Sequence, residues 1–407
     1  MKGGKTQMDH YLEKANQYLK VLCDVKPNRR TGSSGNREAT DFFEKTIRQY
    51  GYDIDAASFT TLDYVCHNTS LTLGDINCEV YASPYSLGCD ITAEIVTVST
   101  LAELKNTNCE GKILLLKGAM CEEQLAPKNF VFYNPEQHKE IVDLLENKKP
   151  GGIIAATKKN PDLAGALCPF PLFVDGDFDI PSVYCLDTVA DEIQTLTDKK
   201  AHLRIDASRL PSSSSNVLAS LNRGKDEKIV ITAHIDAYES TPGALDNASG
   251  TVVLLLIAEM LADYQGKYSV EILALNGEDH YSAAGEMDYL NRYGNEMPEI
   301  LVVINIDDVG FKQGKSTYSF YECRPELEEK VEDVFRKYEG LEKGEQWYAG
   351  DHMVFVQNQV PAIAITSELM PELLKTVTHT SADTPDLVDC QKLVEIAGAL
   401  SDVVRTL

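Results

Sequence analysis

Three short aliphatic runs in the C-terminal half of the chain each end close to a side chain that can bind a metal ion. The runs are residues 229–231 before His234, residues 272–275 before the pair Glu278-Asp279, and residues 301–306 before Asp307. Short apolar runs rich in β-branched residues are typical of buried parallel strands. In an open parallel α/β sheet, the loops that follow the strands meet in a crevice outside their carboxyl ends. The runs therefore predict such a sheet, with a metal site at one edge.

The segments around these runs favour helices that return the chain to the sheet. Residues 252–260 are continuously apolar and must be helical, because parallel neighbouring strands need a crossover connection. Residues 8–50 show two helical patterns separated by a turn at residues 28–36. The glycine-rich stretch 31–36 lacks the Gly-Lys-Ser/Thr ending of a phosphate loop, so we expect a turn with a helix N-cap. The expected fold is a mixed, mostly parallel sheet with helices on both faces.

The middle of the chain has a different character and is predicted to be a separate, inserted module. Short β-rich segments dominate there, with expected strands at 113–116, 152–155 and 181–185 and one helix between residues 135 and 148. Residues 211–216 are polar and rich in serine, which is typical of a linker. We therefore expect a discontinuous catalytic domain of residues 1–57 and 211–407, interrupted by a β-rich domain of residues 58–210.

Composition excludes some classes of partner. The chain has 407 residues, 43% of them hydrophobic, and a net charge of −25, so nucleic acid is not an expected partner. No stretch is long and apolar enough to cross a membrane, and the N-terminus lacks the apolar region of a secretory signal. We expect a cytoplasmic protein without membrane partners, or an exported one if a signal was removed. Its ten cysteines are then expected to be free thiols.

Five local motifs together resemble the two-zinc aminopeptidase family of metallopeptidases, which also includes glutamate carboxypeptidases and glutaminyl cyclases. The motifs are His234-Ile235-Asp236, the stretch GALDNASG at 243–250, Gly277-Glu278-Asp279, Ile306-Asp307 and the stretch HTSADT at 379–384. The likeness is loose over residues 1–57 and close, in order and spacing, over residues 216–407. The middle module resembles a protease-associated insert, through residues 110–115, 149–154 and 180–183. A zinc-exopeptidase-like fold with such an insert is what the resemblance implies.

The resemblance also implies a ligand set for two zinc ions. Asp246 would be the carboxylate that bridges them. His234 and Asp307 would complete one ion, and Asp279 and His379 would complete the other. Each ion would keep an open position for a shared water, as catalytic zinc sites do.

The same resemblance implies roles for two further acidic residues. Glu278 would act as general base on the shared water and return the proton to the leaving amine. Asp236 would orient the imidazole of His234 from behind. A non-proline cis peptide bond is implied after Asp246, and this residue also falls where the N-cap of the next helix belongs.

The chain departs from the family pattern in two places. Asp279 stands where the family usually has the longer Glu, so the second metal is expected to bind less tightly. Thr378 stands where many members have a Tyr that stabilises the oxyanion. Tyr348 is predicted to replace it, because it lies three residues before Asp351-His352, a pair that resembles the family's Ser-Asp-His segment. His352 and His280 are predicted to be neighbours of the site and not ligands.

The expected function is a zinc-dependent exopeptidase, and most specifically an aminopeptidase acting on peptides, with Asp307 and Glu278 near the substrate ammonium group. A carboxypeptidase or dipeptidase of the same family is the main alternative, because Arg292 or Arg324 could face a substrate carboxylate. A glutaminyl cyclase is less favoured, since its pocket is commonly lined by tryptophan and this chain has only Trp347. A binding protein without catalysis is disfavoured because every ligand is present. The sequence does not define the oligomeric state.

Overall fold

The chain consists of two structural units in the computed structural model. The model describes residues 7–130, 134–160, 165–174, 176–196, 199–279 and 284–407. Unit 1 comprises Met1–Thr61 and Ser213–Leu407, and unit 2 comprises Leu62–Ser212. None of the helices in the described residues has the length and apolar character needed to cross a membrane.

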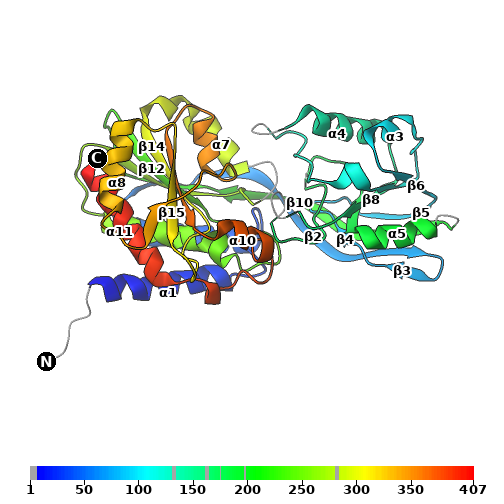
Figure 1. Cartoon of the computed structure of the whole chain (residues 1–407), viewed down its shortest axis with the longest axis horizontal. Coiled ribbons are helices and arrows are strands. Elements are labelled where there is room, and N and C mark those ends of the chain that lie inside the picture. Colours follow the sequence, from blue (N-terminus) through cyan, green and yellow to red (C-terminus); the bar gives the residue numbers. More distant parts are fainter. Residues whose placement is uncertain (1–6, 131–133, 161–164, 175, 197–198, 280–283) are drawn as a thin grey trace. The chain divides into compact units, whose positions relative to one another are not determined.

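Unit 1 is built on a mixed eight-stranded sheet (Figure 1). Its strands, in spatial order, are β1 (Asp53–Asp55), β11 (Val217–Leu221), β13 (Ser269–Leu275), β12 (Lys228–His234), β14 (Ile300–Ile306), β17 (Ala362–Ser367), β15 (Ser316–Tyr321) and β16 (Leu341–Lys343). The four central strands β13, β12, β14 and β17 run parallel, so their carboxyl ends meet at one edge. Antiparallel pairs flank them on both sides. The predicted mixed, mostly parallel sheet is confirmed.

Helices cover both faces of this sheet, as expected (Figure 1). Helix α6 (Gly250–Met260) packs on β12 and β13, and α1 (Gln7–Asp24) and α11 (Cys390–Thr406) pack on α6. Every residue of α6 up to Ala258 is buried, which explains why its sequence is apolar on all sides. Helix α9 (His352–Val356) packs on β14 and β17. The remaining helices are α2 (Ser34–Arg48), α7 (Ala284–Tyr293), α8 (Pro325–Phe335), α10 (Met370–Thr376) and the short helices η3 (Gly294–Glu299) and η4 (Pro385–Leu387).

The glycine-rich stretch before α2 forms a turn with a helix N-cap, as predicted. The hydroxyl of Ser33 accepts a hydrogen bond from the backbone N–H of Asn36 at 3.0 Å. This bond satisfies one of the N–H groups that the first turn of a helix leaves without a backbone partner.

Unit 2 contains two sheets and two separate clusters of buried hydrophobic residues. The five-stranded sheet is β4 (Tyr81–Ala82), β9 (Ser182–Leu186), β8 (Gly152–Thr157), β7 (Ile113–Leu116) and β6 (Ile95–Val98). The four-stranded sheet is β3 (Ile76–Cys78), β2 (Ser58–Leu73), β10 (Ala201–Ser215) and β5 (Cys89–Ala93). Its helices are α3 (Leu101–Asn106), η1 (Gly118–Cys121), α4 (Glu136–Lys148) and α5 (Asp187–Thr195). The three strands and the helix predicted in this region are confirmed.

The prediction of a polar linker at residues 211–216 is wrong, because β10 continues to Ser215. Serines in this stretch serve as internal hydrogen-bond partners within unit 1. Ser214 is buried and its hydroxyl donates to Oδ1 of Asn36 at 2.6 Å. The carbonyl of Ser215 accepts from Nδ2 of Asn276 at 2.6 Å. Buried polar groups need such partners, and a serine-rich sequence looks the same whether it is solvated or enclosed.

Candidate metal centre

The candidate ligands lie at the carboxyl edge of the parallel strands, as the sequence predicts. His234 is the last residue of β12, and Asp307 directly follows β14. Glu278 and Asp279 follow the end of β13 by three and four residues. The side chains of His234 and Asp279 are only 1% and 2% exposed.

Asp246 lies between two imidazole rings and presents one carboxylate oxygen to each. Its Oδ1 is 3.2 Å from Nε2 of His234, and its Oδ2 is 3.2 Å from Nε2 of His379. Nε2 of His234 is also 3.3 Å from Oδ1 of Asp307, and Nε2 of His379 is 2.9 Å from Oδ1 of Asp279. The five side chains thus form two triads that share Asp246, and in each triad the candidate ligand atoms lie within 4.8 Å of one another.

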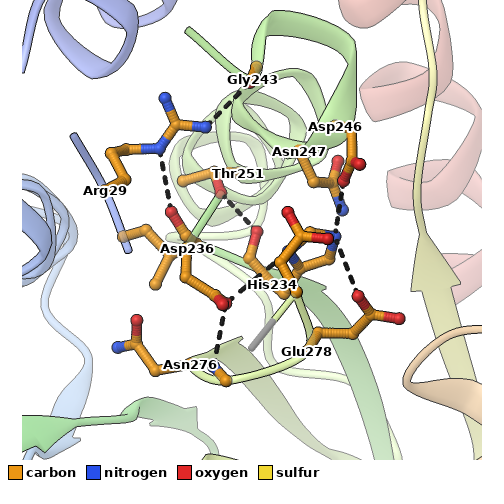
Figure 2. Close-up of polar contacts among 12 residues, drawn as sticks. Arg29, His234, Asp236, Gly243, Asp246, Asn247, Thr251, Asn276 and Glu278 are labelled. Atoms are coloured by element: carbon orange, nitrogen blue, oxygen red, sulfur yellow. Dashed lines mark hydrogen bonds and ion pairs between the residues drawn. The ribbon is translucent and has the colours of Figure 1, made fainter. Parts of the chain in front are cut away.

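The turn η2 (Ala244–Ser249) sets the position of Asp246 (Figure 2). The peptide bond between Asp246 and Asn247 is cis, as the resemblance implies. Nδ2 of Asn247 donates to the carbonyl of Ile306 at 2.8 Å, which ties the turn to the end of β14. The carboxylate of Asp383 accepts the backbone N–H groups of Leu245 and Asp246 at 2.8 and 3.1 Å. Both sides of the turn are therefore anchored.

The expectation that Asp246 caps the following helix is wrong. The backbone N–H of Gly250 donates to Oδ1 of Asn247 at 2.9 Å, so the next residue provides this bond. The carboxylate of Asp246 instead faces the two histidines. A strand-to-helix turn with Asp followed by Asn allows either residue to cap, and the sequence does not distinguish them.

A buried arginine from the N-terminal segment secures the same region (Figure 2). Arg29 is 2% exposed and lies in the stretch that the sequence identified only as a turn. Its guanidinium donates to the backbone carbonyls of Ile235 (3.0 Å), Gly243 (2.8 Å), Pro242 (2.7 Å) and Leu22 (3.0 Å). It thereby connects the end of β12 to the turn that carries Asp246.

Asp236 lies behind the imidazole of His234, on the side away from the triad (Figure 2). Its Oδ1 is 3.7 Å from Nδ1 of His234 and accepts the backbone N–H of Gly277 at 2.9 Å. The residue is fully buried. This arrangement suits a carboxylate that orients the ring while Nε2 faces the ligand triad.

Glu278 belongs to neither triad but lies beside them. Its Oε2 is 3.9 Å from Nε2 of His234 (Figure 2), and 21% of its side chain is exposed. Desolvation raises the pKa of Glu278 well above its usual value; His234 opposes this shift, and the charges of Asp307 and Asp279 add to it. A carboxyl group that holds a proton more firmly is suited to general acid–base chemistry near neutral pH.

The charge balance of the triads fits divalent cations. Desolvation raises the pKa values of Asp279 and Asp307, with a further contribution from the charge of Asp246. Desolvation acts in the same direction on Asp246, but its hydrogen bonds to the two histidines outweigh it and lower the pKa. Oδ2 of Asp279 is buried and has no hydrogen-bond partner among the described residues. Imidazole nitrogen and carboxylate oxygen are ordinary zinc ligands, so the donor set fits zinc.

The structure does not join Tyr348 to the triads through any contact among the described residues. Its side chain is 67% exposed, and its hydroxyl donates to Oε1 of Gln346 at 2.9 Å. Its role at the oxyanion stays a prediction. Thr378, where many family members have tyrosine, is 3% exposed.

His352 is buried beside the site and is not part of either triad. Its Nε2 is 3.0 Å from the carbonyl of Trp347, so this nitrogen carries the proton and donates it. Its Nδ1 is 3.4 Å from Nδ2 of Asn305. Desolvation lowers the pKa of His352 to about 4, with the bond to Trp347 opposing it. The ring therefore stays neutral at physiological pH. His280 lies outside the described residues.

Sequence reasoning missed two features next to the triads. The ring of Tyr238 stacks on the ring of His379, with centroids 4.8 Å apart and planes at 15°. Glu286 is buried, and so is Asp351, whose two carboxylate oxygens have no hydrogen-bond partner among the described residues. Desolvation, with repulsion from Glu278, raises the pKa of Glu286 to about 8. No local sequence pattern distinguishes these residues.

Solved structures of aminopeptidases are similar in fold to this α/β chain. The aminopeptidase of Aneurinibacillus sp. strain AM-1 aligns with a TM-score of 0.75 and 21% identity, covering 97% of this chain and 93% of its own. A zinc aminopeptidase from Bacillus subtilis aligns with a TM-score of 0.72 and 19% identity, covering 97% and 94%.

A family model matches the C-terminal part of the sequence. Residues 216–404 match the model of peptidase family M28. Among curated proteins, the probable lipoprotein aminopeptidase LpqL of Mycobacterium tuberculosis is 21% identical over 296 residues, which are 69% of this chain and 54% of that protein. The chain spans about half the length of the curated relatives it matches first. The resemblance to zinc aminopeptidases is thereby confirmed.

Proposed function

We propose that this chain is a zinc-dependent aminopeptidase that removes N-terminal residues from peptides. The observation that carries the proposal is Asp246, whose two carboxylate oxygens each face the histidine of a separate triad. The match of residues 216–404 to peptidase family M28 supports a peptidase. The names of similar proteins, aminopeptidase and zinc aminopeptidase, support zinc as the metal and the N-terminal end of the peptide as the site of cleavage. Unit 2 would be an inserted, protease-associated-like domain. The cytoplasmic location stays a prediction.

In this proposal, each triad would hold one zinc ion. His234 and Asp307 would hold the first ion, Asp279 and His379 would hold the second, and both would use Asp246. Zinc ions bound there would lower the pKa of the attacking water and polarise the peptide carbonyl.

The chain's own groups then move the proton. Glu278 takes the proton of the attacking water at a carboxylate oxygen and later donates it to the leaving amine nitrogen. Its position 3.9 Å from His234, outside the two triads, keeps its carboxylate available for this task. Asp236 and Arg29 hold the loops in place without contacting substrate.

An aminopeptidase is favoured over a carboxypeptidase by the charges that the site presents. Asp307 and Glu278 offer negative charge to a substrate ammonium group. Arg292, one of the two candidate partners for a substrate carboxylate, is instead engaged with Asp55 at 2.5 Å and Asp288 at 3.5 Å. The hydrogen bond from Arg292 is the leading cause that lowers the pKa of Asp55 to about 2, so this ion pair persists at neutral pH.

A panel of aminoacyl anilides, each paired with its N-acetylated form, tests the proposal on zinc-loaded protein. We expect hydrolysis of the free amines only. Glu278→Gln should keep its zinc and lose about 100-fold or more in kcat, because the proton carrier is removed while the metal ligands stay. Equal hydrolysis of the acetylated substrates would contradict an aminopeptidase, and unchanged kcat in Glu278→Gln would remove this residue from its role.

A further inference from the structure

His379 differs from the other candidate ligands in two ways that leave its ring less well held. Its side chain is 24% exposed, whereas those of Asp246 and Asp307 are 8% and 11% exposed. Its backbone has φ = 66°, in the left-handed region that non-glycine residues adopt rarely and only where neighbouring contacts enforce it. The orientation of its imidazole therefore needs an external support.

Tyr238 provides a flat contact for this ring. The two ring centroids are 4.8 Å apart and the planes are nearly parallel, at 15°. Rotation of the imidazole about its own side-chain axis would break this stack. In the stacked orientation, Nε2 of His379 lies 2.9 Å from Oδ1 of Asp279 and 3.2 Å from Oδ2 of Asp246. The stack thus selects the ring orientation that completes the second triad.

The loop that carries Tyr238 is itself held by buried cations. Oε2 of the next residue, Glu239, is 3.0 Å from Nη1 of Arg30, whose side chain is 5% exposed. Arg29 binds the carbonyls of Ile235 and Pro242 on either side of the same loop. Because the loop is fixed at three points, the side chain of Tyr238 loses little conformational freedom when it packs against the metal ligand His379.

The residue that precedes His379 cannot supply this support. Thr378 has no ring, it is 3% exposed, and its hydroxyl has no partner among the described residues. The aromatic contact with His379 comes instead from the loop after β12, 141 positions earlier in the chain.

We propose that Tyr238 is the positioning residue of His379, and that its ring, not its hydroxyl, sets the affinity of the triad Asp246-Asp279-His379 for its metal ion. The proposal rests on the two-zinc function proposed above. It acts through His379, so Tyr238 need not touch substrate.

Zinc titration of metal-free protein by calorimetry tests this role in wild type, Tyr238→Leu and Tyr238→Phe. Loss of a group that orients a ligand typically weakens metal binding by about 10- to 100-fold, so Tyr238→Leu should weaken one of two sites by about tenfold or more. The other site, with His234 and Asp307, is the internal reference and should not change. Tyr238→Phe keeps the ring and should match the wild type. Tyr81→Leu, an exposed tyrosine in unit 2, is the matched control and should also match it.

Activity at saturating zinc separates positioning from direct catalysis. With both sites filled, kcat of Tyr238→Leu on an aminoacyl anilide should return to the wild-type value. A kcat that stays low would mean that Tyr238 contacts the reacting groups, and would overturn the proposal. Two unaltered sites in Tyr238→Leu, or an equal loss in Tyr238→Phe, would also overturn it. Wild-type protein that binds fewer than two zinc ions would contradict the proposed two-zinc function. Failure of the proposed function is therefore seen in the wild type, whereas failure of the role of Tyr238 is seen only in its variants.

Discussion

At the scale of single residues, the candidate site depends on a buried arginine as well as on its acids and histidines. Arg29 contributes nothing to metal chemistry, yet its guanidinium donates to four carbonyl groups. Three of them, those of Ile235, Pro242 and Gly243, lie between His234 and Asp246, and the fourth is that of Leu22 in α1. Without it, the carbonyl of Gly243 would keep the backbone N–H of Ala248 as a donor, and the other three carbonyls would lose the bond from the guanidinium. An unpaired buried polar group destabilises a fold by about 1 to 3 kcal/mol.

We therefore predict that Arg29→Met lowers the free energy of unfolding by about 3 kcal/mol or more, measured by urea denaturation. Arg336→Met is the matched control. Arg336 is 61% exposed and pairs with Glu332 and Asp333 on the surface of α8, so its loss should change stability by less than about 1 kcal/mol. Equal stability of the two variants would mean that Arg29 does not hold the loops.

The residues that the sequence revealed and those that it did not differ in the range of their contacts. His234, Asp279 and Asp307 could be predicted because a strand pattern and a ligand occur within a few positions. Arg29 and Tyr238 act on residues more than 130 positions away, at Ile235 and His379. Such a contact leaves no local pattern, and only the folded backbone defines it.

At the scale of elements, the turn η2 is a close-packed connection between β12 and α6. A Cβ atom added at Gly250 would lie 2.3 Å from Oδ1 of Asn247 and 2.5 Å from the carbonyl of Ile306. These are the groups that join the turn to β14 and to the start of the helix. The turn therefore has no room for a side chain at this position.

Gly250→Ala should destabilise the protein by about 1 to 3 kcal/mol, as overpacking in a rigid environment does, and should weaken zinc binding because Asp246 must move. Gly294→Ala is the control, since an added Cβ there meets no atom within 4 Å. Thermal unfolding and zinc titration of both variants provide the measurements. A Gly250→Ala protein that binds zinc as tightly as Gly294→Ala would contradict this description of the turn.

Helix α9 begins with His352, whose ring is buried in its neutral form. The folded pKa of His352 is about 4, below the value of about 6.5 in an unfolded chain. The unfolded state therefore binds more protons between these values, so stability is lost as the pH falls from about 6.5 to 4. The full effect of this one group is about 3 kcal/mol.

His352→Gln should remove this part of the pH dependence. The loss of unfolding free energy between pH 7 and pH 4 should be smaller in the variant than in the wild type by about 3 kcal/mol, while other groups cancel in the comparison. Urea denaturation at both pH values measures it. Parallel pH profiles for the two proteins would show that His352 is not buried in its neutral form.

Elements with a strong apolar pattern were predictable, and polar segments were not. The strands β7, β8, β12, β13 and β14 and the helix α6 follow directly from runs of aliphatic residues. The segment at 211–216 was misassigned because Ser214 and Asn216 supply internal hydrogen bonds, to Asn36 and Asn276, that a composition-based assignment takes for solvation. The cap of α6 was misassigned by one residue for a similar reason.

At the scale of the whole molecule, every candidate metal ligand belongs to unit 1. All five lie between His234 and His379, within the segment Ser213–Leu407. Zinc that binds the folded state stabilises it by about 2.7 kcal/mol at a free concentration 100 times the Kd. This stabilisation should reach unit 1 and not unit 2.

Hydrogen exchange with and without zinc tests this distribution. Amides of β12, β13 and β14 should exchange more slowly when zinc is present, and those of β7, β8 and β9 should not change. Asp246→Ala is the control, and zinc should have a much smaller effect on its exchange because the shared ligand is gone. Equal protection of both units in the wild type would contradict a site confined to unit 1.

The central claim is that one carboxylate joins two metal sites, and anomalous diffraction at the zinc absorption edge tests it most directly. Crystals of the zinc-loaded protein should show two peaks, one beside His234 and Asp307 and one beside Asp279 and His379. Each should lie about 2.0 to 2.2 Å from a different oxygen of Asp246. A single peak, or two peaks of which only one contacts Asp246, would contradict the account.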